Sequence, residues 1–172
     1  RIDIINRQPL SEDLQEHIIE AVETIAPDVD AVIVADQVDE ETLGVVTPTM
    51  RERLCVMARS RPDCIFFADS RAHIGEFANM MIKPNVHEAT RAAGLAEDAE
   101  PAAIARALYD RTGRPIFLTL GEEGICVYDG AECAHIPGFP ASGPIDIVGA
   151  GDSATAGIVP ARGGRGLGFE RR

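Results

Sequence analysis

Hydrophobic and polar positions alternate in two different ways along the chain. In some stretches the apolar residues lie three and four positions apart, which predicts amphipathic helices. The first follows Ser11, a good N-cap, and stops before Pro27, and three more are predicted at 48–59, 85–94 and 101–112. Between them lie short continuous apolar runs, typical of strands covered on both faces, at 30–35, 64–68, 80–83 and 116–120. This order predicts a layered α/β domain with a mostly parallel sheet.

The pattern changes after residue 120. Residues 124–128 and 132–136 alternate with a period of two on either side of Asp129-Gly130, which indicates a β-hairpin. The sheet is therefore expected to end in an antiparallel ribbon. A loop rich in proline, glycine and serine follows at 137–144, and an apolar strand at 145–148 runs directly into a helix of small residues.

Composition restricts the class of protein. The 172 residues are 45% hydrophobic and 26% charged, as in one globular domain, and 16 Lys and Arg against 28 Asp and Glu give a formal charge of -12. Such an acidic chain offers no basic surface for nucleic acid or an anionic membrane, so neither partner is expected. No apolar run approaches the roughly 20 residues that span a bilayer, and no signal-peptide pattern opens the chain. A soluble, cytoplasmic protein is expected.

The two ends and the cysteines add further expectations. The chain starts with Arg1 rather than Met, and Pro160 is followed by a run of glycines and arginines. We therefore expect residues 1–172 to form a single partial domain, truncated at both ends, with an irregular tail over 160–172. The four cysteines are widely spaced without a C-x-x-C pair, so reduced, mostly buried thiols are expected rather than a zinc site.

The strongest chemical signal is the segment Gly149-Ala150-Gly151-Asp152, between a predicted strand and a predicted helix. Backbone N–H groups at the start of a helix lack helical partners, and the helix dipole adds partial positive charge there. Glycines let a phosphate approach this backbone closely, so the turn is a candidate anion site. For this motif alone, a capped helix after a tight turn is the better explanation.

Two other clusters follow predicted strands. Asn85 and Glu88 stand one helical turn apart, which also fits a capping box, and Thr119 with Gly121 follows the strand at 116–120, which also fits a hairpin turn. Polar and glycine-rich residues at the carboxyl ends of several parallel strands are what a ligand crevice in an open α/β sheet requires. Together the three clusters favour a ligand site.

In this order the motifs resemble the carboxyl-terminal part of the ribokinase-like (PfkB) carbohydrate kinase family, over about 30–159. Residues 146–152 match the family's Asp-Thr-x-Gly-Ala-Gly-Asp signature except that Ile147 replaces Thr. Asn85 and Glu88 resemble its Asn-x-x-Glu motif, and Thr119 with Gly121 resembles its Thr-x-Gly turn. The segments 30–36, 68–71 and 82–85 are similar to the branch that contains heptose-phosphate kinases. The implied fold is a three-layer αβα arrangement with a mostly parallel sheet and an antiparallel ribbon.

The resemblance implies ATP-dependent phosphorylation of a hydroxyl of a sugar or sugar phosphate. Asp152 would be the general base, and the N–H groups of Gly149, Ala150, Gly151 and Asp152 would form an anion hole. Glu88 and Asn85 would organise Mg²⁺ through water. The residues implied for the nucleotide are Lys83, Asn85, Thr119, Gly121 and Gly124. Asp146 would belong to the family's monovalent cation site.

Other classes fit less well. No G-x-x-x-x-G-K-[ST] motif occurs, which excludes a P-loop NTPase, and too little chain follows Gly151 for the acidic residue that a Rossmann dehydrogenase needs on its next strand. A catalytically silent nucleotide-binding fragment stays open as an alternative, because the family's sugar-binding residues lie in an amino-terminal portion. The intact parent could form a homo-oligomer.

Overall fold

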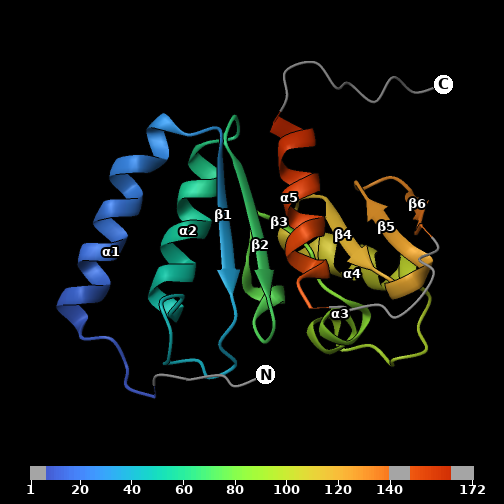
Figure 1. The fold of residues 1–172 in the computed structure, drawn as a ribbon, viewed down its shortest axis with the longest axis horizontal. Helices are drawn as coiled ribbons and strands as arrows, with labels where there is room; N and C mark the ends of the chain where they lie inside the picture. The colour runs from blue at the N-terminus through green and yellow to red at the C-terminus, as the bar shows by residue number, and fades with distance from the viewer. Residues whose placement is uncertain (1–6, 140–147, 164–172) are drawn as a thin grey trace.

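The computed structural model describes residues 7–139 and 148–163, which form one six-stranded sheet in the order β1-β2-β3-β4-β5-β6 (Figure 1). The first four strands are parallel, whereas β5 and β6 continue the sheet as an antiparallel ribbon. The predicted sheet is confirmed. The strands are β1 Ala31–Asp36, β2 Ile65–Ser70, β3 Met81–Ile82, β4 Ile116–Thr119, β5 Gly124–Tyr128 and β6 Cys133–Pro137.

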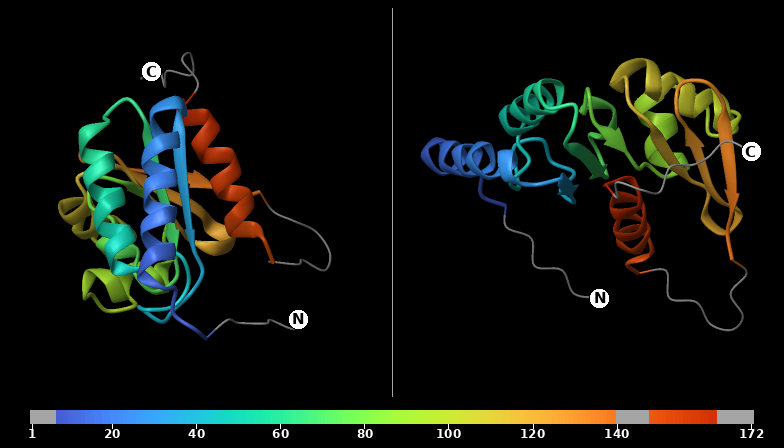
Figure 2. Two further views of the ribbon diagram at one scale, coloured as in Figure 1. Left: turned by 90° about the vertical axis from the view of Figure 1, so that its left-hand side faces the viewer. Right: turned by 90° about the horizontal axis from the view of Figure 1, so that it is seen from above.

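Helices cover both faces of this sheet and give three layers. Four helices lie on one face and α5 lies on the other, as Figure 2 shows. The helices are α1 Glu12–Ile25, α2 Pro48–Ser60, α3 Val86–Ala93, α4 Pro101–Thr112 and α5 Ala150–Gly163. Short 3₁₀ turns are η1 Ala26–Asp28, η2 Ile74–Glu76 and η3 Gly121–Glu123. No helix in the described ranges is long and apolar enough to cross a membrane.

Local sequence signals explain where the helices begin and end. The side chains of Ser11 and Thr47 accept hydrogen bonds from the N–H groups of Leu14 and Met50 at the starts of α1 and α2. Helix α4 begins with Pro101, whose missing N–H is not needed there. Helices α3 and α4 end on glycines in the left-handed conformation.

The continuous apolar runs fill two cores because successive strand residues point to opposite faces. Phe66 and Leu118 belong to the large core under α1–α4. Their neighbours Phe67 and Phe117 point the other way and pack with Val159 of α5, with 5.8 Å between the two ring centroids. A strand buried on both faces therefore needs apolar residues at successive positions, as β2 has over 65–68 and β4 over 116–118.

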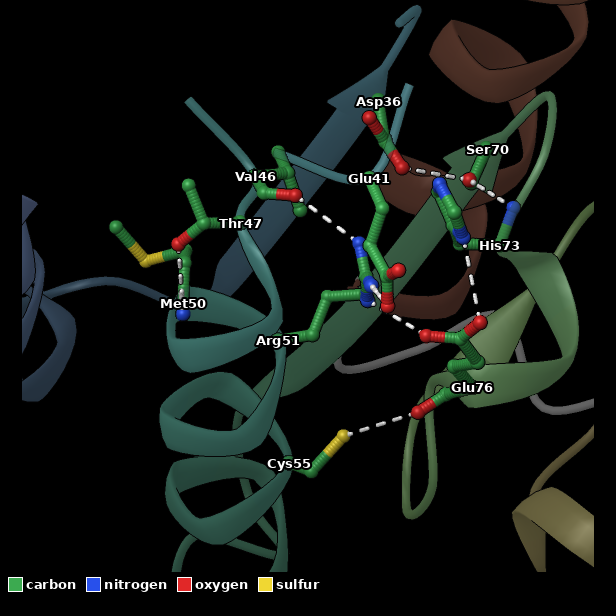
Figure 3. A network of polar contacts seen from close by, with 10 residues as sticks. All are labelled: Asp36, Glu41, Val46, Thr47, Met50, Arg51, Cys55, Ser70, His73 and Glu76. Carbon is green, nitrogen blue, oxygen red and sulfur yellow. Dashed lines mark hydrogen bonds and ion pairs between the residues drawn. The ribbon is translucent and has the colours of Figure 1, made fainter. Parts of the chain in front are cut away.

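A polar network fixes the ends of β1 and β2 on the side of α2 (Figure 3). The Ser70 hydroxyl donates to Asp36 Oδ2 at 2.7 Å and accepts from the His73 N–H at 3.1 Å. The buried Arg51 guanidinium pairs with Glu76 Oε2 at 2.9 Å and so ties α2 to η2. These contacts satisfy polar groups that burial would otherwise penalise, and they hold the end of β2 in place.

Two expectations need correction. The tail was predicted to be irregular from Pro160, but α5 includes this proline and continues to Gly163. An internal proline costs a helix about 3 kcal/mol. Burial of Val159 and the position of the Arg162 guanidinium 5.6 Å above the Phe117 ring offset that cost. Residues 164–172, and the predicted strand at 145–148 except its last residue, lie outside the described ranges.

The second correction concerns the cysteines, which were expected to be reduced. The antiparallel ribbon brings the Cα atoms of Cys126 and Cys133 to 5.9 Å, and the structure joins their sulfurs in a disulfide. Cys55 and Cys64 are free thiols. Burial raises the pKa of both, which keeps them protonated and poorly nucleophilic.

Candidate active site

The carboxyl ends of β3 and β4 bring two of the predicted clusters into direct contact. Asn85 forms an isolated parallel bridge with Thr119. The Thr119 N–H donates to the Pro84 carbonyl at 2.9 Å, and its hydroxyl donates to the same oxygen at 3.3 Å. Residues that are 34 positions apart in the sequence therefore lie side by side, as the parallel topology predicts.

Asn85 and Glu88 make the capping box that was the structural explanation for their spacing. Asn85 Oδ1 accepts from the Glu88 N–H at 2.8 Å, and Glu88 Oε2 accepts from the Asn85 N–H at 2.8 Å. The two side chains are thereby fixed at the start of α3. A capping role does not exclude a ligand role, because each side-chain oxygen has more than one lone pair.

The pKa of Glu88 depends on burial and on its polar and charged neighbours. Burial raises the pKa of its half-buried carboxyl, and the nearby Asp69 carboxylate raises it further. The Asn85 N–H, Lys83 and Arg91 act in the opposite direction and favour the charged form. A carboxylate whose charge is disfavoured in this way gains from a cation bound beside it.

Lys83 and Asp69 form an ion pair at the end of β2 and just after β3. Lys83 Nζ lies 2.9 Å from Asp69 Oδ2, and the two side chains are 5% and 16% exposed. Lys83 was predicted for the site, but Asp69 was not. Its position at the carboxyl end of a buried strand was the one signal for it, and a surface turn would give the same signal.

The start of α5 lies against this ion pair. A Cβ atom placed on Gly151 would be 3.4 Å from Lys83 Nζ and 3.9 Å from Asp69 Oδ2. Gly149 has a φ of 81°, a left-handed conformation that favours glycine. The Asp152 side chain is exposed in the first turn of the helix. The predicted anion turn therefore lies at the carboxyl ends of the parallel strands, as Asn85 and Thr119 do.

Two glycines near β5 have structural reasons for being glycine. A Cβ on Gly124 would lie 2.1 Å from the carbonyl oxygen of Ile136, so the approach of β6 alone requires glycine there. Gly121 begins η3 with a φ of 63°, and no atom lies within 4 Å of a Cβ placed on it. Gly121 is thus accessible near Thr119, whereas Gly124 is half-buried and its backbone lies close against β6.

The remaining predicted features are limited to what the described ranges contain. Asp146 lies outside them. No group of three or more His, Cys, Asp or Glu that could hold a metal ion occurs within them. Asn85 and Glu88 nevertheless fit Mg²⁺ that is bound together with a nucleotide, since Mg²⁺ commonly uses one or two carboxylates, water and phosphate oxygens. A cavity of about 350 Å³ lies away from this site, at the amino-terminal ends of β1 and β2. Its lining includes Asp30, Arg61 and Cys64.

Sequence comparison finds a matching family and a relative of this chain. The family model for pfkB family carbohydrate kinases matches residues 4–162. The bifunctional protein HldE of Wolinella succinogenes is 28% identical over 164 residues, covering 92% of this chain and 33% of that protein.

Two solved structures share the fold at low sequence identity. Phosphofructokinase-2 from Escherichia coli, in complex with fructose-6-phosphate, superposes with a TM-score of 0.64 and 18% identity over 90% of this chain and 51% of its own. Ribokinase from Thermotoga maritima superposes with a TM-score of 0.60 and 16% identity over 82% and 45%. The chain thus spans about a third of the HldE protein and about half of each kinase, and its fold is the ribokinase-like αβα arrangement.

Proposed function

Because the chain belongs to the PfkB family of carbohydrate kinases, we propose that it is the nucleotide-binding part of an ATP-dependent sugar or sugar-phosphate kinase of the cytoplasm. The observation that carries this proposal is that three predicted motifs lie together at the carboxyl ends of the parallel strands. They are the turn at 149–152, the Asn85 and Glu88 pair, and the Thr119 and Gly121 turn. The anion turn at the start of α5 lies against Lys83, and Asn85 lies beside Thr119.

Phosphoryl transfer needs mainly positioning and charge stabilisation from a protein. Asp152, exposed in the first turn of α5, accepts the proton of the acceptor hydroxyl as that oxygen attacks the γ-phosphate. The N–H groups of Gly149, Ala150 and Gly151 with that of Asp152 donate to the oxygens on which charge develops. The helix dipole adds to this stabilisation.

The nucleotide lies, in this proposal, over the ends of β3 and β4. Lys83 pairs with a phosphate, and Thr119, Gly121 and Gly124 line the nucleotide side. Asn85 and Glu88 orient the water shell of Mg²⁺, which neutralises phosphate charge when it is bound with ATP. Asp146 contributes to a monovalent cation site.

A second candidate is a nucleotide-binding chain without phosphoryl transfer. It is favoured by the coverage, because this chain spans only about half of the kinases that share its fold. The family's sugar-binding residues lie in the amino-terminal portion of its members.

One pair of measurements separates the two candidates. Mg-ATP binding is measured by titration calorimetry, and turnover is measured with a panel of sugars and sugar phosphates. Both are applied to residues 1–172 and to a protein that also carries the amino-terminal portion. We expect weak Mg-ATP binding without turnover for the chain alone, and turnover for the longer protein. Robust turnover by residues 1–172 alone, or no Mg-ATP binding by either protein, would contradict the proposed site.

A further inference from the structure

Lys83 is the single lysine of the chain, and its ammonium group is almost completely buried. A buried charge is tolerated only when it is paired, because a charged group loses its favourable hydration when it leaves water. The carboxylate of Asp69, 2.9 Å away, supplies that partner. Stability alone does not explain a buried ion pair beside Glu88, since two apolar side chains in its place would stabilise the fold at least as well. The pair is therefore a candidate for a role in binding.

The pair is held by three separate elements. Asp69 belongs to β2 and Lys83 follows β3, and the Lys83 N–H donates to the Ala68 carbonyl at 3.0 Å, so the two strands are joined where their side chains pair. Ser70, the next residue, points to the other face of the sheet and is fixed by Asp36 in the network of Figure 3. The direction of Asp69, toward α5, is therefore set by the strand itself.

The third element is the start of α5. Because a Cβ on Gly151 would come within 3.4 Å of Lys83 Nζ, the ammonium lies directly beside the backbone of the anion turn. A positive group there would add to the partial charge of the helix N-terminus. An ammonium has three N–H donors, so one carboxylate oxygen leaves donors for a second acceptor.

From this arrangement we propose that Asp69 is a positioning residue that holds the Lys83 ammonium beside the Gly149–Asp152 turn, where it meets a phosphate oxygen of the nucleotide. The inference rests on the proposed function. Lys83 keeps its pairing with Asp69 while it contacts the phosphate, so the ammonium is in place before the nucleotide arrives. Nucleotide binding then carries no additional entropy cost for ordering the Lys83 side chain.

The single lysine makes this inference directly measurable. Labelling the chain with lysine that carries ¹⁵N only at Nζ gives one side-chain resonance, whose shift and exchange with water report the pairing of the ammonium. We compare the wild-type chain with Asp69→Asn, which keeps the shape but removes the charge, and with Asp69→Glu, which restores a carboxylate. Asp63→Asn, an exposed carboxylate at the opposite ends of the strands, is the matched control.

In the wild-type chain and in Asp63→Asn we expect a distinct, slowly exchanging Nζ signal that moves when millimolar Mg-ATP is added. Asp69→Asn should accelerate Nζ–H exchange by about tenfold or more, since one partner of a buried pair is lost, and should weaken the response to Mg-ATP. Asp69→Glu should recover part of both. A purely structural role for Asp69 would move the melting temperature without changing the response of Nζ to Mg-ATP.

Contradicting results are distinguishable. A solvent-like, rapidly exchanging Nζ signal in the wild-type chain overturns the inference even if Asp69→Asn does not fold. The same holds if Asp69→Asn leaves Nζ unchanged, or if Mg-ATP shifts the backbone amides of Gly149–Asp152 without moving Nζ; in each case the proposed function stands. If Mg-ATP moves neither the amides nor Nζ, both the proposed function and the inference fall.

Discussion

At the scale of single residues, a substitution of Asp152 shows whether this side chain acts as a catalytic base or only as a helix cap. Asp152→Asn keeps the shape and the hydrogen-bonding capacity of the side chain but cannot accept the hydroxyl proton. General acid-base contributions are typically worth roughly 10² to 10⁴ in rate, so we expect kcat of the proposed kinase, measured with the amino-terminal portion present, to fall by that factor. Asn caps helices about as well as Asp, so the melting temperature and Mg-ATP affinity should stay nearly unchanged.

The control for Asp152 is Asp98→Asn, which neutralises an exposed carboxylate between α3 and α4. Measuring kcat, the Kd of Mg-ATP and Tm side by side separates charge from position. A kcat that stays the same in Asp152→Asn would remove this residue from the mechanism.

Gly151 tests the anion turn without changing any charge. Alanine favours a helix over glycine by up to about 1 kcal/mol, and a methyl group at this position fits without a clash. Gly151→Ala should therefore not lower the free energy of unfolding in urea. The methyl group would nevertheless stand beside Lys83 Nζ, where the phosphate is proposed to bind, so Mg-ATP affinity should fall.

Gly157→Ala is the matched control, because Gly157 lies in the same helix and a Cβ there would have no neighbour within 4 Å. It should show the same effect of helix propensity on unfolding with no change in Mg-ATP affinity. Equal nucleotide binding by the two variants would argue against a phosphate at the start of α5.

At the scale of elements, the start of α3 combines a structural cap with a perturbed carboxyl group. Because burial raises the pKa of Glu88 above the ordinary value of a glutamate, the folded state holds this proton more tightly than the unfolded state does. The stabilising contribution of the protonated form is complete below about pH 4.5 and is lost as the pH rises through the folded pKa. Glu88→Gln keeps a capping-box acceptor but has no proton to lose.

We therefore expect urea unfolding from pH 4 to 7 to show Glu88→Gln gaining stability relative to the wild type as the pH rises, and then levelling off. Asn85→Ala is the comparison, because it removes the cap itself and should cost about 0.5–2 kcal/mol. A wild type that gains on Glu88→Gln with rising pH would mean that the pKa is lowered rather than raised.

The elements also show what a sequence can and cannot predict here. Helix α4 and strand β5 have the predicted bounds, because proline and glycine at their ends and the hydrophobic period between them are local signals. The continuation of α5 past Pro160 was missed because it depends on packing against Phe117, a residue far away in the sequence. The ion pair of Asp69 with Lys83 was not predicted for the same reason, since the two residues meet only through the pairing of β2 with β3.

At the scale of the whole molecule, the two faces of the sheet are covered unequally. Helices α1–α4 cover one face, whereas within the described ranges α5 alone covers the other (Figure 2). Ile33 on β1 is paired with Phe67, and Ile136 on β6 is paired with Ile125, so both point to the α5 side, where they remain 50% and 48% exposed. Strands β1 and β6 also leave the two edges of the sheet unpaired within those ranges. Exposed apolar strands and open edges favour association.

We therefore predict that residues 1–172 self-associate through the α5 side of the sheet. The formal charge of -12 opposes contact between copies, and salt screens that repulsion. The mass measured by light scattering should thus rise with protein concentration and with added NaCl. Ile33→Lys should shift the chain toward the monomer, whereas Val56→Lys, on α2 with a similar 49% exposure, should not. Equal effects of the two substitutions, or a mass that stays monomeric at high salt, would contradict association through this face.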